Sequence, residues 1–127
     1  MKRIDFQPFL EAGVLILCRP ETPDEQQSYV DFAVDLDDGE AQALALAKHR
    51  QLVLTTDERP GLRIAAASAV NVSTLTTPAL LKEWASLNAD NERRMVDIVR
   101  RIAAGARYHA PRDNPLYDWW QSLVSAL

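Results

Sequence analysis

Short apolar runs alternate along the chain with segments in which apolar residues recur at helical spacing. Residues 13–18 form an uninterrupted apolar run of strand length, and residues 51–56, with the sequence LVLT at 52–55, predict a second buried strand. Several of the helical segments begin with Thr-Pro or Asn, which are typical first residues of helices. We expect helices at 22–34, 41–49, 62–69, 77–84, 89–104 and 115–127, and a short strand at 70–74. This alternation predicts an α/β fold with a small, mostly parallel sheet flanked by helices.

The composition narrows the class of protein. The chain has 127 residues, of which 47% are apolar and 25% charged, the ordinary mix of a single globular domain. One cysteine, Cys18, excludes an internal disulfide framework and a cysteine-rich zinc module, and its place in an apolar run predicts a buried side chain. The net charge of −4 excludes a broad cationic coat for nucleic acid. The longest apolar run is too short for a bilayer and the start lacks a signal-peptide pattern, so we expect a cytoplasmic protein that makes no membrane contact.

The first candidate site is a group of acids, Asp37, Asp38 and Glu40, at the start of an expected helix. Asp37 followed three residues later by Glu40 is the pattern of a capping box, and acids suit the positive end of a helix. The same carboxylates are ligands for a hard cation such as Mg²⁺. Spacing alone favours the capping interpretation, and the metal interpretation requires a further acid from another element.

The second candidate is Asp57, which follows directly on the expected strand at 51–56 and has Glu58 beside it. Ligands of parallel sheets bind beyond the carboxyl ends of the strands, where Glu40 is also expected. A divalent cation removes the repulsion between two such carboxylates and activates a water molecule as a nucleophile. Glu40 and Asp57 are therefore candidate metal ligands, with a turn or capping role as the alternative for Asp57.

Basic and aromatic residues offer further contacts. Arg59 and Arg63 lie close to Asp57 in the sequence and would steady a substrate phosphate, unless they pair with nearby acids. A denser basic set on the late helix is the only candidate nucleic-acid patch, with a solvated face as its alternative: Arg93, Arg94, Arg100, Arg101 and Arg107. Trp119 and Trp120 are expected to anchor the C-terminal helix in the core.

Two linked motifs resemble the second half of PIN domains. Residues 36–47 read LDDGEAQALALA and residues 52–59 read LVLTTDER. The sequences RIA at 63–65 and VNVSTL at 70–75 continue the resemblance, which covers about residues 12–86. Either motif alone is weak, whereas the two in this order are fairly specific.

PIN domains are α/β nucleases that cut RNA with Mg²⁺ or Mn²⁺ held by a cluster of acids, and many are the toxin of a toxin–antitoxin pair. The resemblance implies a PIN-like α/β core at residues 1–87, with a helical C-terminal extension at 88–127 packed on the same domain. It implies that Glu40 and Asp57 are the catalytic metal ligands, assisted by Asp37 or Asp38, of which Asp38 is included among the expected metal residues. The partners it implies are RNA, a cognate antitoxin-like protein and further copies of the chain in a homo-oligomer.

The chain departs from the PIN pattern at its start. The first strand of that family carries an Asp, but Asp5 has no apolar strand around it and Glu11 has no matching context. We therefore expect a core without that strand, through truncation, loss of catalysis or completion by another chain. The sequence predicts a PIN-like metal-dependent endoribonuclease domain; the alternative is a non-catalytic PIN-like module that binds RNA or protein.

Overall fold

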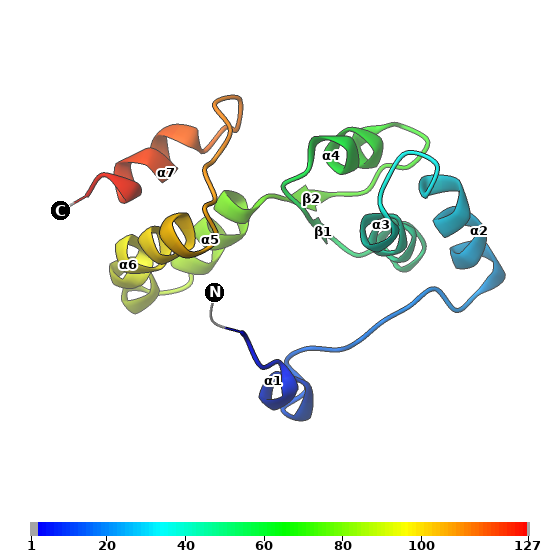
Figure 1. The fold of residues 1–127 in the computed structure, drawn as a ribbon, viewed down its shortest axis with the longest axis horizontal. Helices are drawn as coiled ribbons and strands as arrows, with labels where there is room; N and C mark the ends of the chain where they lie inside the picture. Colours follow the sequence, from blue (N-terminus) through cyan, green and yellow to red (C-terminus); the bar gives the residue numbers. More distant parts are fainter. Residues whose placement is uncertain (1–2, 127) are drawn as a thin grey trace. The chain divides into compact units, whose positions relative to one another are not determined.

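The computed structural model describes residues 3–126 of the chain, in which helices predominate (Figure 1). The chain forms two compact units. The first contains the chain up to Leu54 together with Glu58–Thr74, and the second contains Thr55–Asp57 together with the chain from Leu75 onward. No helix within residues 3–126 is long and apolar enough to cross a bilayer.

The first unit is built on three helices, α2 (Pro23–Phe32), α3 (Asp38–Arg50) and α4 (Arg59–Ala66). Helix α2 begins where the Thr-Pro pattern predicts, and its first turn is closed by a reciprocal capping box between Thr22 and Glu25. Helix α3 contributes three of the seven residues of the buried core, more than any other element. The buried core consists of Leu36, Ala41, Leu44, Ala47, Leu54, Ala65 and Val72.

Two short parallel strands, β1 (Leu54–Thr55) and β2 (Thr74–Leu75), form the sheet, and α4 connects them. The N–H of Leu54 donates to the Ser73 carbonyl and the N–H of Thr56 donates to the Leu75 carbonyl, each at 3.0 Å. The broad α/β prediction is therefore confirmed. The expected strand at 70–74 begins only at its last residue, since the backbone of Val70 and Asn71 bonds to Ala67 in a turn after α4.

The expected strand at residues 13–18 is wrong. A short helix, α1 (Gln7–Glu11), ends before it, and residues 16–20 form neither helix nor strand (Figure 1). Ile16 and Leu17 are 78% and 84% exposed, and Cys18 is exposed rather than buried. An apolar run becomes a strand only when a neighbour accepts its backbone hydrogen bonds, and no described strand lies beside this one.

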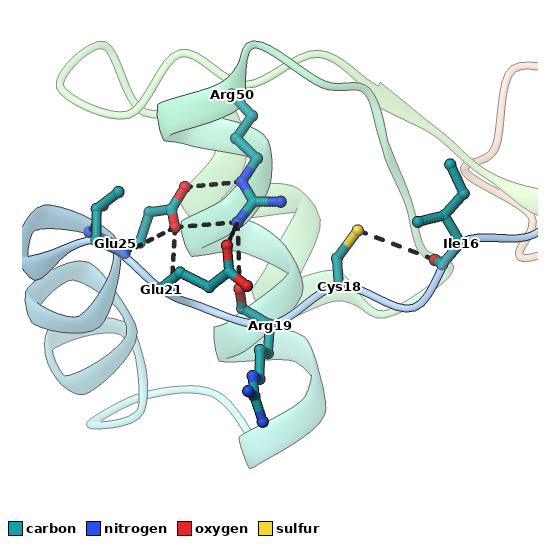
Figure 2. A network of polar contacts seen from close by, with 7 residues as sticks. Ile16, Cys18, Arg19, Glu21, Glu25 and Arg50 are labelled. Carbon is teal, nitrogen blue, oxygen red and sulfur yellow. Dashed lines mark hydrogen bonds and ion pairs between the residues drawn. The ribbon is translucent and has the colours of Figure 1, made fainter.

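A partly buried ion pair joins α2 to the end of α3. Figure 2 shows the Arg50 guanidinium facing the Glu25 carboxylate, with N···O distances of 2.8 Å from Nε and 3.1 Å from Nη2. The same Nη2 donates to the carbonyl of Arg19 at 3.2 Å. Hydrogen bonds from Arg50 and from the backbone N–H groups of Glu21 and Thr22 lower the pKa of Glu25 to about 2. This pair fixes where the chain enters α2.

The second unit packs three helices, α5 (Thr77–Ala85), α6 (Ala89–Gly105) and α7 (Tyr117–Val124). The side chain of Asn88 accepts from Asn91 N–H at 2.8 Å, so the predicted cap of α6 is confirmed. Trp120 is fully buried and meets the Tyr108 ring edge to face, with ring centroids 5.2 Å apart. The expected anchoring of the C-terminal helix is therefore confirmed for Trp120.

Candidate metal centre

The first turn of α3 carries two of the carboxylates. Asp37 is the N-cap residue, and its Oδ1 accepts from the backbone N–H of Glu40 at 2.8 Å. This is one half of the predicted capping box, because the Glu40 side chain is turned elsewhere. The side chain of Glu40 is half-buried, whereas that of Asp37 is exposed. Local sequence thus places both acids at the positive end of one helix.

The third carboxylate comes from the start of α4. Glu58 occupies the N-cap position, but its side chain makes no capping hydrogen bond to that helix. One carboxylate oxygen from each of Asp37, Glu40 and Glu58 lies within 4.8 Å of the others. The N-terminal ends of α3 and α4 therefore bring three acids together in the first unit, as a single cation with several oxygen ligands requires.

The carboxylates of Asp37, Glu40 and Glu58, which we call the acidic cluster, repel one another. The pKa of Glu58 is raised, first by the negative charge of Glu40, then by that of Asp37, and further by a hydrogen bond to Glu40. A helix N-terminus by itself lowers the pKa of an acid, so the neighbouring carboxylates outweigh the helix dipole at this position. A divalent cation would remove that repulsion.

A glycine makes room for the central carboxylate. Gly61 lies in the first turn of α4, and a Cβ built on it would stand 1.9 Å from Oε1 of Glu40. No side chain other than hydrogen fits there while the Glu40 carboxylate keeps its place. The position of this carboxylate thus depends on a residue 21 positions away in the sequence.

The other predicted acids have different partners. Asp38 accepts a hydrogen bond from the Tyr29 hydroxyl at 2.6 Å. Asp57 belongs to the second unit, where it accepts from Thr77 N–H at 2.8 Å, from Thr77 Oγ1 at 2.5 Å and from the Tyr108 hydroxyl at 3.1 Å. The structure thus groups Glu40 with Asp37 and Glu58, and it groups Asp57 with two hydroxyl groups of its own unit.

The contacts of Asp57 give it a structural role. Its Oδ1 satisfies the free N–H of Thr77, the first residue of α5, so it closes the start of that helix. Burial, followed by the charge and the hydrogen bond of Asp57, raises the pKa of Tyr108. The Tyr108 hydroxyl therefore stays protonated and donates to Asp57 throughout the physiological pH range.

The arginines divide between the two units. Arg59 opens α4 directly after Glu58, and Arg63 is exposed in the last turn of the same helix. On α6, Arg93 pairs with an acid three residues before it and Arg101 with an acid four residues before it, at 3.3 and 3.1 Å. The alternative of a solvated face with acidic partners is thus observed for those two side chains.

Glu58 is the member of the acidic cluster that sequence reasoning left out of the predicted metal ligands. Its only signal is its place directly before Arg-Pro-Gly at a helix start, a pattern that does not indicate which acids lie opposite. No protein-family model, curated protein or solved structure matches this chain. The resemblance to PIN domains therefore stays a prediction.

Proposed function

We propose that the first unit binds a divalent cation, Mg²⁺ or Mn²⁺, and that the chain is a PIN-like metal-dependent endoribonuclease domain. One observation carries the proposal: carboxylate oxygens of Asp37, Glu40 and Glu58 converge within 4.8 Å from the starts of two helices. The raised pKa of Glu58 supports it, because the charges of Glu40 and Asp37 oppose its ionisation and a bound divalent cation would offset that repulsion.

Each residue has a stated role in this proposal. Asp37, Glu40 and Glu58 would hold the cation, which when bound supplies Lewis-acid activation for phosphodiester hydrolysis. Arg63 is exposed on the helix that starts at the acidic cluster, and Arg59 opens that helix, so both would contact substrate phosphate. A catalytic role for Asp57 is supported only by the resemblance to PIN domains.

A second function, a non-catalytic module that binds RNA or a cognate antitoxin-like protein, is supported by the contacts of Asp57. Both of its carboxylate oxygens already accept hydrogen bonds from Thr77, and Oδ1 also accepts from Tyr108. In this case the acidic cluster would bind a cation without cleavage.

The test is a Mn²⁺ titration of the full chain by calorimetry, followed by an RNA-cleavage assay with Mg²⁺, Mn²⁺ or EDTA. Glu40→Gln and Glu58→Gln keep the side-chain size and should each weaken Mn²⁺ binding at least about tenfold. Glu83→Gln, at an exposed position of α5, is the matched control and should bind as the unchanged protein does.

The outcomes separate the two functions. Cleavage that requires metal and is lost in both variants supports the nuclease. Mn²⁺ binding without cleavage of any RNA tested favours the non-catalytic module. Binding that is equal in Glu40→Gln, Glu58→Gln and the control would overturn the metal site.

A further inference from the structure

Exposed apolar side chains concentrate near the start of the chain. We call residues 3–19 the N-terminal arm; it contains α1, none of whose residues is buried. Seven large apolar side chains of the arm are 40–84% exposed: Ile4, Phe6, Phe9, Val14, Leu15, Ile16 and Leu17. An apolar surface of this extent on one short segment indicates a surface that another molecule covers.

Part of the backbone of the arm makes no hydrogen bond to the rest of the described chain. The N–H groups of Val14 and Leu15 donate to the Phe9 carbonyl. The next three N–H groups, those of Ile16, Leu17 and Cys18, have no hydrogen-bond partner within residues 3–126. A segment with β-branched and apolar side chains and free backbone donors is suited to add to the edge of a sheet.

The two-stranded sheet has such an edge. Leu54 and Thr56 donate their N–H groups to the β2 side, so the backbone of Val53 and Thr55 faces the opposite edge of β1. No strand of the described chain pairs there, since the sheet consists of β1 and β2. Leu52 and Val53, which lead into β1, are 50% and 56% exposed.

We propose that two copies of this chain associate by exchanging arms: residues 14–18 of each copy pair with the free edge of β1 in the other copy. Each chain offers one unpaired apolar segment and one unpaired strand edge. In a dimer with a two-fold axis, each arm therefore pairs with the β1 edge of the other copy. Both β1 edges are then covered, and no further chain can add to them.

Charge favours a second copy as the occupant. The arm carries Arg3 and Arg19 against Asp5 and Glu11, so it is neutral, whereas the whole chain has a net charge of −4. A neutral arm can therefore approach the β1 edge of another acidic copy without net charge repulsion. A lipid surface fits less well, because a segment that binds at a membrane surface carries an excess of Lys and Arg, which the arm lacks.

The arm does not pair with β1 of its own chain, because the described sheet consists of β1 and β2 alone. The Arg50 guanidinium donates to the Arg19 carbonyl at 3.2 Å, as Figure 2 shows, so the last residue of the arm is held at the end of α3. Ile16 and Leu17 remain 78% and 84% exposed, although β1 follows Arg50 within four residues.

The first experiment is sedimentation over a range of concentrations. The unchanged protein should form a dimer, and Leu17→Asp should weaken that association at least about tenfold because it places a charge in the apolar interface. Leu87→Asp is the matched control: it makes the same change at a side chain that is 73% exposed in the second unit. Circular dichroism should show that both variants fold, since neither side chain is buried. A monomer at all concentrations, or equal weakening by both variants, would overturn the proposal.

The second experiment identifies the strand that is paired. Cys18 is the single cysteine, so one added cysteine at Leu52 or Thr56 creates a defined pair under mild oxidation. If the strands run antiparallel, Leu52→Cys should yield a disulfide-linked dimer; if they run parallel, Thr56→Cys should do so. The unchanged protein controls for a direct link between two copies of Cys18. A disulfide within one chain, or no new disulfide in either variant, contradicts the exchange of arms.

Discussion

Replacing Gly61 by Ala tests the acidic cluster without altering any of its acids. The added Cβ would stand 1.9 Å from Oε1 of Glu40 and 2.8 Å from its carboxylate carbon. Because an ordinary contact begins near 3.4 Å, that oxygen must withdraw by roughly 1.5 Å. The carboxylate is the far end of a flexible side chain, so it can move while α4 stays in place.

This displacement is large for a metal ligand. Carboxylate oxygens bind Mg²⁺ at about 2.0–2.1 Å, so a shift of roughly 1.5 Å removes Glu40 from direct coordination. We expect Gly61→Ala to weaken Mn²⁺ binding about 10–100-fold, the usual effect of losing support for a metal ligand. Alanine also favours the helix by about 0.5–1 kcal/mol over glycine, so the free energy of unfolding should stay equal or rise.

Calorimetric Mn²⁺ titration and thermal unfolding measure the two effects separately. Gly39→Ala is the matched control, since Gly39 lies in the first turn of α3 and a Cβ there meets Asp37 at an ordinary 3.9 Å. The carboxyl resonance of Glu58 gives a readout that requires no metal: its pKa should fall in Gly61→Ala, because Glu40 is its strongest perturber. Unchanged Mn²⁺ affinity together with an unchanged Glu58 pKa would refute the geometry of the site.

Three further predictions concern the contacts outside the acidic cluster. Arg50→Gln should lower Tm, because it leaves the buried Glu25 without its positive partner. The pKa of Glu25 is held at about 2, so this stabilisation is present above pH 4.5 and disappears as the pH falls toward 2. In acid unfolding of Arg50→Gln, the free energy of unfolding should therefore change less with pH over this range than in the unchanged protein. Trp120→Ala should destabilise the protein by about 3–5 kcal/mol in chemical denaturation, since it empties a fully buried site, and a loss below 1 kcal/mol would contradict the packing described. Asp57→Asn should abolish any Mg²⁺-dependent RNA cleavage if Asp57 is catalytic, whereas Thr77→Val, which removes only a hydroxyl donor to Asp57, should lower Tm and retain cleavage.

The starts of α2, α5 and α6 could be predicted because their start signals are local, whereas α1 was not expected and α4 begins at Arg59 rather than at residue 62. Asn88 caps α6, and the Thr-Pro pair at residues 22–23 opens α2, through contacts that span a few residues. The broad α/β class followed from the apolar run that ends in β1 and from its alternation with helices. Such signals need no knowledge of what lies across the fold.

Features that depend on distant segments could not be predicted in this way. The run that contains Ile16 has the composition of a buried strand, but whether it pairs depends on a neighbouring edge, and in this structure it has none. Glu58 joins Glu40 only because α3 and α4 begin at the same place. Asp38, the neighbour of an acid in the cluster, turns instead to Tyr29. Position in the sequence shows which acids are available, and packing decides which of them meet.

Glu58 distinguishes two reasons for the three acids to lie together: to hold a cation, or only to cap helices. Capping accounts for Asp37, whose Oδ1 accepts from Glu40 N–H, but Glu58 makes no capping bond and its pKa is raised rather than lowered. An acid with a raised pKa destabilises the folded state when ionised, and this cost disappears as the pH falls below its ordinary pKa. Without metal, Glu58→Gln should therefore raise Tm at pH 7 and have little effect at pH 3. With saturating Mn²⁺ at pH 7 the unchanged protein should have the higher Tm, because it gains stability from a cation that Glu58→Gln binds weakly. If Mn²⁺ raises Tm equally in both proteins, Glu58 is not a ligand and the acids gather for structural reasons alone.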